Sequence, residues 1–532
     1  MNTDKKYILA IDLGTSGPKV TLVSTDFEVV GNEFESTDLH LFDNGGAEQD
    51  PAQWWKTISN CTKRLISKGL VPVEDIEAIS CTAQWSGTVA VDKEGKNLMP
   101  SIIWMDSRGS KQIEKITDGL IKVEGYAASK IFSWMNITGG APGHSGKDPV
   151  AHILYIKENK PEIYQKTYKF LEPKDYINLL LTGQFVSTPE TMCLHWVMDN
   201  RNINDIDYHP KLLKWTGLER EKLPDLVKQT DVVGTILPEI AREFGLKEGV
   251  KVIGGTADVQ AAAIGSGAVR DYEAGLCFGT SSFLTCHVPH KATDIFHNMA
   301  TLPSGIPGKY FVANEQETAA VCLNFLKDNI FFADDLLNTE ANGKDVHEAF
   351  SELAASVPAG SEGLIFTPWL YGERTPIEDH SVRGGWHNLS LKMTRAHMVR
   401  SVLEGVAFNA RWLLKYVETS KFVPKSHRPF KWINFIGGGA KSDLWCQILA
   451  DILQRPIRQV NEPRHANARG VAALAMVSLG YASFEDIAEK TIIDREYEPN
   501  PDNKQLYDSL FSEFLKIYDK NKGIYKRLNS KH

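Results

Sequence analysis

The segment Asp12-Leu13-Gly14-Thr15-Ser16 ends an apolar run that begins at Tyr7, and a related segment, Phe278-Gly279-Thr280-Ser281-Ser282, recurs in the middle of the chain. Each copy places Gly-Thr-Ser at the end of a strand-like run. A second β-rich run follows in both cases, at residues 20–23 and 283–288. Because β-branched and aromatic residues favour strands, the two segments predict two hairpins whose turns have the same composition.

These predicted turns suit an anion such as phosphate. Gly14 and Gly279 allow the backbone to approach a phosphate closely, and clustered N–H groups in a turn form an anion-binding concavity. The hydroxyl donors beside them are Thr15, Ser16, Thr280 and Ser281. Ordinary turn chemistry explains either copy alone. One copy in each half, however, favours a duplicated fold that binds the phosphates of a nucleotide from both sides.

Size and composition narrow the class of protein. The chain has 532 residues, which is too many for one core and enough for two large domains. Its 59 basic and 67 acidic residues give a net charge of −8, which disfavours a nucleic-acid or anionic-membrane partner. Seven scattered cysteines disfavour a disulfide framework or a zinc site. Asp12 interrupts the first apolar run too early for a signal peptide, so we expect a cytoplasmic protein.

Strand-like and helix-like segments alternate along the chain, which predicts an α/β architecture. Asp50-Pro51 has the composition of a helix start, and residues 151–182 follow a helical pattern. The three small residues Gly265-Ser266-Gly267 would allow a hinge. We therefore predict an N-terminal domain at 1–265 and a C-terminal domain at 266–532.

Asp258 is the strongest candidate for a catalytic residue. It follows the apolar run at 250–254 and a Gly-Thr-Ala turn, beside the predicted hinge. A carboxylate at a strand end in an interdomain cleft can accept a proton from a substrate hydroxyl, and phosphoryl transfer needs a group that orients or deprotonates the nucleophile. The alternative role is a helix N-cap, because residues 259–263 could begin a helix. The two roles are compatible.

Three further positions could contact a nucleotide and its metal. Asp12, at the end of the first predicted strand, could hold Mg²⁺ directly or through water, or could simply stabilise the turn. Lys19, beyond the turn, could reach a phosphate oxygen, although exposed lysines are common on strands. The turn Gly437-Gly438-Gly439-Ala440 follows another predicted strand and would let a flat group such as adenosine approach the backbone. Its alternative is a tight connection between a strand and a helix.

Together these segments resemble the FGGY carbohydrate kinases, a family of the actin-like ATPase superfamily. The resemblance covers nearly the whole chain and depends on the order and spacing of the segments, since each one alone is weak. The landmarks are Asp12-Leu13-Gly14-Thr15-Ser16, Glu48-Gln49-Asp50-Pro51, Trp104-Met105-Asp106-Ser107-Arg108, Lys174-Asp175-Tyr176, Gly254-Gly255-Thr256-Ala257-Asp258, Gly279-Thr280-Ser281, Leu403-Glu404-Gly405 and residues 437–450.

The resemblance implies two ribonuclease-H-like domains with ATP in the cleft between them. It also implies transfer of the γ-phosphoryl group to a terminal hydroxyl of a sugar or polyol. By motif position, Asp258 corresponds to the family's catalytic base and Asp12 to its Mg²⁺-associated carboxylate. The N-terminal domain would hold the sugar and the base, and the C-terminal domain would hold the nucleotide. The positions that match phosphate or adenosine contacts are Gly14, Thr15, Gly279, Thr280, Gly438, Gly439 and Ala440.

The substrate is less closely defined by the resemblance. The predicted sugar contacts are Gln84, Trp85, Ser86 and Asp106. Ser86 stands where xylulokinases have a histidine, and Val259 stands where they have an asparagine. Such changes alter hydroxyl recognition, because unpaired buried polar groups are costly. The resemblance favours a ketopentose such as xylulose, or a related pentulose or polyol.

Two alternatives stay open. One is a catalytically silent sugar-sensing protein on the same fold, and the other is a kinase for glycerol or another polyol. The glycerol kinases have an Arg-Glu pair that the loop at Gln84 lacks. The sequence does not define the oligomeric state, and a homodimer is among the options.

Overall fold

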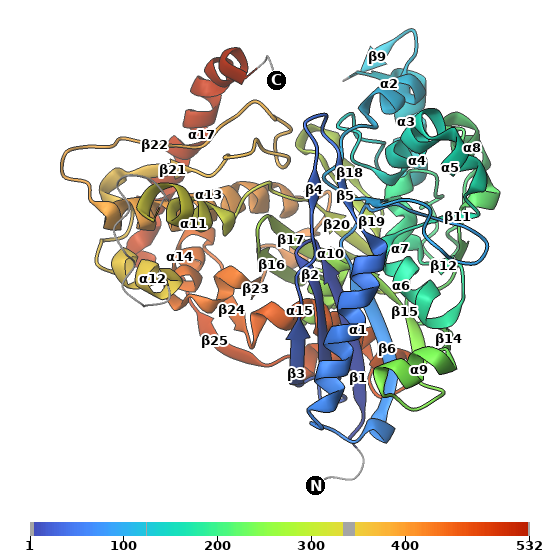
Figure 1. Cartoon of the computed structure of the whole chain (residues 1–532). Helices are drawn as coiled ribbons and strands as arrows, with labels where there is room; N and C mark the ends of the chain where they lie inside the picture. The colour runs from blue at the N-terminus through green and yellow to red at the C-terminus, as the bar shows by residue number, and fades with distance from the viewer. Residues whose placement is uncertain (1–4, 124, 333–345, 530–532) are drawn as a thin grey trace.

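Two β-sheets, one built from each half of the chain, form the framework of the molecule (Figure 1). The computed structural model describes residues 5–123, 125–332 and 346–529. Within these ranges the first sheet has six strands, in the order β14 (Val232–Thr235), β15 (Lys251–Ala257), β6 (Ile76–Ala83), β1 (Tyr7–Gly14), β2 (Gly17–Ser24) and β3 (Val29–Phe34). The second has eight, in the order β18 (Thr293–Asp294), β19 (Met299–Pro303), β20 (Tyr310–Ala313), β17 (Ser282–Val288), β16 (Ala274–Phe278), β23 (Ile433–Gly437), β24 (Ile457–Val460) and β25 (Ile493–Tyr497).

The two sheets share one core topology, which confirms the predicted duplication. Each contains an antiparallel hairpin, β1–β2 or β16–β17. A parallel strand lies beside the first strand of each hairpin, β6 beside β1 and β23 beside β16. A second parallel strand follows, β15 beside β6 and β24 beside β23. The two Gly-Thr-Ser turns join the hairpins, so each half presents its turn beside the carboxyl ends of its parallel strands.

The side chains of β1 alternate between the two faces of the first sheet. Ile11 and Leu13 belong to the core under the outer helices, whereas Ile8 and Ala10 belong to a separate core on the inner face. Asp12 continues the second row, because successive side chains of a strand point to opposite faces. Its carboxylate therefore lies on the face that is turned toward the other half of the molecule.

Outer helices cover the far face of each sheet. Those on the first sheet are α1 (Pro51–Ser67), α6 (Pro173–Thr182) and α9 (Pro238–Phe244), and those on the second include α13 (Arg395–Val417), α14 (Asp443–Leu453) and α17 (Pro501–Asn529). The predicted start of α1 is confirmed. Asp50 caps this helix by accepting the Ala52 N–H at 2.9 Å, and Pro51 is its first residue.

Two inner helices cross where the halves meet. The helix α10 (Asp258–Gly265) follows β15 of the first sheet, and α15 (Ala466–Ser478) follows β24 of the second. Each packs beyond its own half. The helix α15 lies on the inner face of the first sheet, in contact with β1, β6 and β15. The helix α10 contributes Ala262 to an apolar cluster with Ile436 and Val460 of the second sheet.

The crossing of α10 and α15 is unusually close. A Cβ atom on Gly265 would lie 1.8 Å from the carbonyl oxygen of Ala466, and one on Gly470 would lie 1.8 Å from the carbonyl oxygen of Ala261. Any larger residue at either position would force the helices apart. Gly265, where we predicted a hinge, is the last residue of α10 and permits tight packing between the halves.

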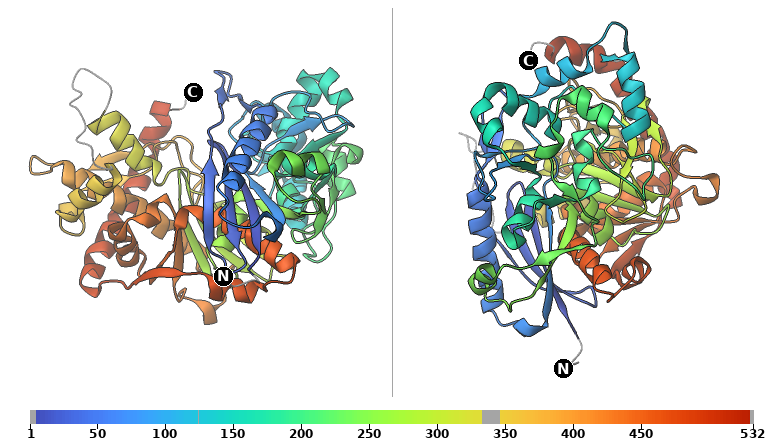
Figure 2. Two further views of the ribbon diagram at one scale, coloured as in Figure 1. Left: turned by 60° about the horizontal axis from the view of Figure 1, so that its bottom comes forward. Right: turned by 90° about the vertical axis from the view of Figure 1, so that its right-hand side faces the viewer.

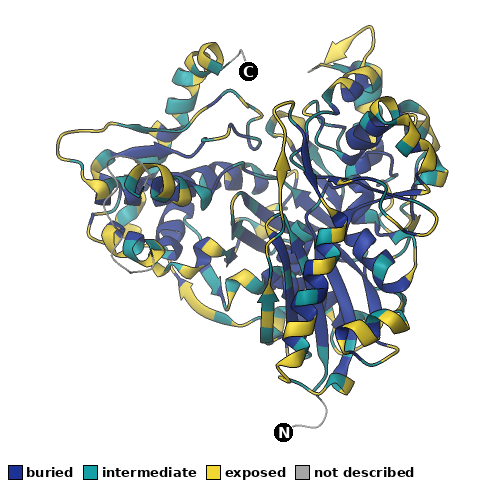
Figure 3. Cartoon of the chain, viewed as in Figure 1, coloured by how far each residue is buried: buried dark blue, intermediate teal, exposed yellow. Residues whose placement is uncertain are grey.

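A further layer of short helices covers one end of the first half (Figure 2). It contains α2 (Ser110–Thr117), α3 (Ala128–Thr138), α4 (Pro149–Asn159), α5 (Pro161–Lys166) and α8 (Pro210–Thr216). Burial follows the layers, with the central strands of both sheets dark, and the edge strands and outer helix faces more exposed (Figure 3). In the described part of the chain, every helix is too short or too polar to span a bilayer.

One secondary-structure prediction was partly wrong. The helical pattern expected over residues 151–182 is interrupted by a strand, β11 (Lys169–Leu171), which pairs with β7 (Val89–Val91). Pro173 then starts α6, which ends at Gly183 as expected, with φ of 75°. Pairing with a distant strand overrode the local periodicity, which sequence patterns cannot register.

Candidate active site

The strands β1, β6 and β15 end at the same edge of the first sheet and bring three predicted segments together. Leu13 pairs with Ala83, and Ala83 pairs with Ala257. The turn after β1, the loop after β6 and Asp258 therefore follow one another side by side. We name residues 84–87 the β6 loop.

Asp258 begins α10 at the end of β15, whose register shifts between Ile253 and Thr256. The N-cap position is Ala257, so Asp258 is not the capping residue that we considered as an alternative. Its carboxylate accepts the Val259 N–H at 2.8 Å. Burial and then the negative charge of Asp12 raise the pKa of Asp258 to about 7, against the opposing effect of the Val259 and Trp85 N–H groups. A carboxyl group that titrates near neutrality suits a general base for a hydroxyl.

Asp12 and Lys19 both contact the second half of the chain. Asn467 of α15 donates to Asp12 Oδ1 at 3.4 Å. Burial raises the pKa of Asp12, while Lys19 and Asn467 act to lower it. Lys19 Nζ donates to the carbonyl oxygen of Arg464 at 3.1 Å, so part of its hydrogen-bonding capacity is already used. Asp12 is thus held at the boundary of the halves, close enough to Asp258 to affect its charge.

The oxygen donors around Asp12 fit a hard cation that phosphates help to hold. Within the described ranges, no group of three or more His, Cys, Asp or Glu side chains could bind a metal by itself. Mg²⁺ commonly takes one or two carboxylates, with waters and substrate phosphates as its other ligands. Asp12 and Asp258 provide two desolvated carboxylates beside a phosphate-type turn.

A ring of hydrogen bonds joins the first turn to the β6 loop. Thr15 Oγ1 donates to Gln84 Oε1 at 3.1 Å, Gln84 Nε2 donates to Gln49 Oε1 at 2.7 Å, and Gln49 Nε2 donates to the Thr15 carbonyl oxygen at 2.8 Å. Trp104 Nε1 also donates to Thr15 Oγ1, at 3.0 Å. Gln84 and Gln49 are buried. The turn and the loop therefore form one connected unit. Gln49 and Trp104, which the sequence indicated only as landmarks of the resemblance, are parts of it.

The other predicted sugar contacts are also held by the protein. Trp85 Nε1 donates to the Thr191 carbonyl oxygen at 2.9 Å, and Ser86 Oγ donates to the Lys147 carbonyl oxygen at 2.9 Å. These two bonds orient the indole of Trp85 and tie the β6 loop to the segment that precedes α4. The hydroxyl of Ser86 has then given its only proton to the protein.

Asp106 is enclosed by donors. The N–H of Ala47 and the Arg108 guanidinium contact its Oδ2 at 2.9 Å and 2.6 Å, and the Arg108 N–H contacts its Oδ1 at 2.9 Å. Arg108 also pairs with Glu48 at 2.6 Å. With 1% of its surface exposed, Asp106 organises the loop around it more than it offers a free carboxylate.

In the second half, β16 and β23 bring the other two predicted segments together. Phe278 pairs with Gly437, so the Gly279 turn lies beside the glycine-rich turn. Gly437 has φ of 89°, and a Cβ there would lie 2.5 Å from the Phe278 carbonyl oxygen. Gly438 is exposed, and nothing lies within 4 Å of a Cβ placed on it. An open backbone beside a hydroxyl-bearing turn leaves room for a flat ring.

The predicted nucleotide contacts differ in exposure. Ser16, Thr280 and Gly438 are exposed, Gly14, Thr15, Lys19, Gly279 and Ser281 are partly exposed, and Gly439 and Ala440 are buried. The buried pair can shape the turn but offers little surface to a ligand. Burial and then the charge of Asp258 raise the pKa of Cys277 in β16 to about 12, so the electrostatic influence of the acid extends to the strand that carries the second turn.

A charged cluster from the second half lies near Asp258 and Lys147, and sequence reasoning missed it. Arg374 pairs with Glu315 and, at 2.8 Å, with Glu317. The buried carboxylate of Glu373 accepts the N–H groups of Arg374 and Glu317, which joins the two segments. Glu315 acts on the pKa values of both Asp258 and Lys147. The cluster therefore lies near the candidate base, although 59 residues separate Glu315 from Arg374 in sequence.

Lys147 is the cation that faces this cluster. Its Nζ lies 5.8 Å from the centre of the Tyr371 ring. Burial lowers its pKa, with opposing effects from Glu317. Within the described ranges, Lys147 has no ion-pair partner within 4.0 Å. Lys147 and the cluster around Arg374 lie far apart in the sequence and in no periodic pattern. The sequence alone therefore did not reveal that they are neighbours.

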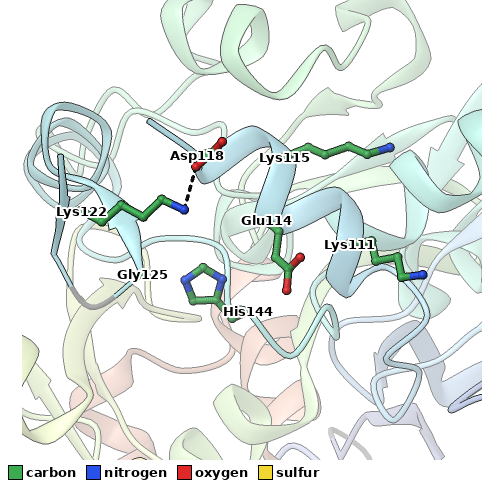
Figure 4. A pocket seen from close by; sticks show the side chains of 7 residues that line it. All are labelled: Lys111, Glu114, Lys115, Asp118, Lys122, Gly125 and His144. Atoms are coloured by element: carbon green, nitrogen blue, oxygen red, sulfur yellow. Dashed lines mark ion pairs between the residues drawn. The ribbon is translucent and has the colours of Figure 1, made fainter. Parts of the chain in front are cut away.

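A separate depression lies on the surface of α2 (Figure 4). It is lined by Lys111, Glu114, Lys115, Asp118, Lys122, Gly125 and His144. Asp118 and Lys122 pair at 2.8 Å, and Lys115 pairs with Glu158 at 2.7 Å. None of the residues assembled around Asp258 lines it. Its charges are largely matched by neighbours, which is typical of a solvated surface.

The comparisons with known proteins agree with this geometry. The model of the N-terminal domain of the FGGY family of carbohydrate kinases matches residues 7–265, and that of the C-terminal domain matches residues 274–479. A xylulose kinase of Staphylococcus epidermidis is 29% identical over 531 residues and covers 98% of both chains. A gluconokinase of Bacillus subtilis is 26% identical over 513 residues, which are 96% of this chain and 95% of that one. The crystal structure of a ligand-bound xylulose kinase from Lactobacillus acidophilus matches with a TM-score of 0.83 and 25% identity, over 98% of this chain and 100% of the other.

Two ribonuclease-H-like halves with phosphate-type turns and an acid between them define the fold of a sugar kinase. The chain belongs to the FGGY family of carbohydrate kinases. Members of this family use ATP as the phosphate donor, and the predicted fold and enzyme class are thereby confirmed.

Proposed function

We propose that this carbohydrate kinase phosphorylates a terminal hydroxyl of a ketopentose such as xylulose, with Asp258 as the catalytic base. The observation that carries the proposal is the position of Asp258 at the end of β15, beside the β6 loop and within electrostatic reach of Asp12 and Glu315. The full-length similarity to xylulose kinases supports this substrate class.

The proposed chemistry follows from the state of Asp258. With its pKa raised to about 7, a large share of the group is ionised at neutral pH and can still hold the proton that it takes. Asp258 would accept the proton of the attacking hydroxyl and orient the oxygen toward the terminal phosphoryl group. Phosphoryl transfer depends mainly on such positioning and on charge stabilisation.

The nucleotide would bind across the two halves. Gly14, Thr15, Gly279 and Thr280 would contact the phosphates through turn N–H groups and hydroxyls, and Gly438 would lie against the adenosine. Asp12 would hold Mg²⁺, which supplies positive charge to the phosphates when bound. Lys19 would support this arrangement, and Ser16 and Ser281 would lie at its rim. Gly439 and Ala440 would shape the glycine-rich turn.

The acceptor would bind between the β6 loop and Asp258. The indole of Trp85 is oriented by Thr191 and would pack against the sugar ring or chain. Gln84, Ser86 and Asp106 are held by protein partners, so we assign them mainly to shaping the site. These hydrogen bonds hold the β6 loop in place before the sugar binds, so few groups with fixed positions would recognise the sugar.

A second candidate substrate, a sugar acid such as gluconate, is favoured by Lys147. Its ammonium group is partly buried near the β6 loop and has no ion-pair partner in the described part of the chain. A carboxylate on the acceptor would supply one. The full-length similarity to a gluconokinase agrees with this alternative.

The test is a coupled ADP assay over a panel of pentuloses, hexuloses, polyols and aldonic acids, followed by mapping of the phosphorylated carbon. We expect ADP release to rise most with a ketopentose. A preference for an aldonate that is lost in Lys147→Met would select the second candidate. Release that does not respond to any acceptor would contradict both and favour the sugar-sensing alternative.

The proposal also covers where the protein acts and with which partners. We expect the protein to act in the cytoplasm on a small-molecule sugar, without a nucleic-acid partner. A homodimer is compatible with these properties, and sedimentation analysis of the purified protein would determine the state.

A further inference from the structure

A buried carboxyl group lies directly beneath the β6 loop and has no role in the chemistry proposed above. Glu172, the residue before α6, is 1% exposed. Its Oε2 accepts the Gly87 N–H at 2.9 Å. The contact is tight, because a Cβ atom on Gly87 would lie 2.5 Å from Pro173 Cγ. The end of the β6 loop is therefore pressed against the residues that begin α6.

The loop needs this support because its backbone is strained. Ser86 has φ of 66°, a left-handed conformation that residues other than glycine seldom adopt. Such a conformation persists where the surroundings hold it, and it is concentrated at functional sites. Ser86 Oγ is anchored on the Lys147 carbonyl oxygen, and the next N–H is anchored on Glu172. Loss of Glu172 would leave the buried Gly87 N–H unpaired.

On its other side, Glu172 faces a buried histidine. Its second oxygen, Oε1, lies 3.9 Å from Nδ1 of His195, and neither atom has a hydrogen-bond partner within the described ranges. Burial raises the pKa of Glu172 well above its usual value and lowers that of His195 to about 3. Burial therefore disfavours a charge on either group. An amide in place of the carboxyl group would keep an oxygen that accepts the Gly87 N–H.

The start of α6 also contacts the strand that carries the candidate base. Lys174 Nζ donates to the Gly254 carbonyl oxygen at 2.9 Å, in the shifted part of β15 that precedes Asp258. One helical turn thus touches the β6 loop through Glu172 and the approach to Asp258 through Lys174. A change in this turn would alter the separation between the two.

We propose that Glu172 is a positioning residue of the acceptor site, which holds the β6 loop and the indole of Trp85 at the separation from Asp258 that the sugar requires. The inference rests on the proposed function, because it assigns the β6 loop to the acceptor. It gives Glu172 an effect on acceptor binding that is distinct from any effect on the nucleotide.

The test compares Glu172→Ala and Glu172→Gln with the wild-type protein, using xylulose or the best acceptor from the panel. We expect Glu172→Ala to raise the acceptor KM roughly tenfold, the equivalent of one lost buried hydrogen bond. The KM for ATP should stay unchanged. Glu172→Gln keeps an acceptor for the Gly87 N–H and should restore the acceptor KM.

Asp451→Ala is the matched control. Asp451 is 4% exposed in α14 and accepts the Asn500 N–H at 2.8 Å, so its loss also removes a buried carboxyl group from a backbone donor. We expect it to lower the melting temperature without a change in the acceptor KM. An unchanged acceptor KM in folded Glu172→Ala would reduce Glu172 to a structural role and overturn the proposal. A Glu172→Gln variant as defective as Glu172→Ala would overturn it as well.

Calorimetric titration of the same sugar without ATP separates this inference from the proposed function. If the wild type binds the sugar but transfers no phosphate, the proposed function fails. Roughly tenfold weaker binding by Glu172→Ala would still support the positioning role in that case. Equal sugar affinity in both proteins, or no binding by either, would contradict it.

Discussion

The two sheets use the same topological position for different purposes. After β6, the first half has a polar loop in which Gln84 and Ser86 are buried, Trp85 is partly buried, and all three are bonded to their surroundings. After the equivalent strand β23, the second half has a glycine-rich turn with an exposed, open backbone at Gly438. One loop is suited to recognising a hydrated molecule through fixed groups, and the other to accommodating a flat ring. In the proposed assignment, the first loop contacts the acceptor and the second contacts the nucleotide.

The two halves also differ in the acidic side chains near their turns. Asp12 stands two residues before the glycine of the first turn, and Cys277 holds the corresponding place before the second. Asp258 follows the last parallel strand of the first half as well. Both carboxylates next to the predicted phosphate site therefore come from the first half. We expect the largest losses of catalysis from variants in the first half, and the largest losses of nucleotide affinity from variants in the second half.

The largest expected effect comes from Asp258→Asn. Removal of a general base should lower kcat by about 10²- to 10⁴-fold, while ATP binding, measured by calorimetry, should stay close to that of the wild type. Cys277→Ala, at the position of the second half that corresponds to Asp12, is the control and should keep kcat within about twofold, as it removes no charge or hydrogen bond. Near wild-type turnover in folded Asp258→Asn protein would remove the assignment.

Gly438→Val tests the other side of the comparison. The position is open, so the variant should fold, but the side chain would occupy the space proposed for adenosine. We expect the KM for ATP to rise roughly tenfold, or about 1.4 kcal/mol of lost binding, with the acceptor KM unchanged. Initial-rate kinetics with each substrate varied in turn would measure both. A rise in the acceptor KM alone would mean that the two loops have been assigned to the wrong substrates.

The pH dependence sharpens the role of Asp258. Because its pKa is raised to about 7, the folded state binds its proton more tightly than the unfolded state does. This preference costs stability as the pH rises from the ordinary aspartate range toward 7. Asp258→Asn should therefore melt a few degrees above the wild type at pH 8, and this difference should shrink at pH 5. The kcat/KM of the wild type should rise with pH through the same range.

Lys19→Ala should have the smallest effect. Lys19 already donates to the Arg464 carbonyl oxygen and is only one of several groups near the predicted phosphates. We expect the KM for ATP to rise by no more than about threefold, as for a partly exposed charge in water. A loss as large as that of Gly438→Val would show that Lys19 binds phosphate directly.

The features that could be predicted from the sequence are those encoded in short segments. The Gly-Thr-Ser turns, the cap at Asp50 and the acid after β15 each depend on a few adjacent residues, and the structure has all of them. The interruption of the helical pattern by β11 depends on a partner strand about 80 residues away, so it was missed.

The rest of the candidate site depends on contacts between distant segments. Gln49 completes a ring with Thr15 and Gln84, and Arg374 reaches Glu315 from a separate loop. Glu172 meets Gly87 across 85 positions of sequence. None of these residues belongs to a periodic pattern, because their importance arises only when the strands align. A single sequence records composition and spacing but not that alignment.

The central claim is that both turns and Asp258 converge on one triphosphate and one acceptor hydroxyl. A crystal structure with a non-hydrolysable ATP analogue, Mg²⁺ and the preferred acceptor tests it most directly. We predict that the phosphates contact the Thr15 and Thr280 turns together and that the acceptor hydroxyl lies within hydrogen-bonding distance of the Asp258 carboxylate. A nucleotide held by one half alone, or an acceptor bound away from Asp258, would contradict the account.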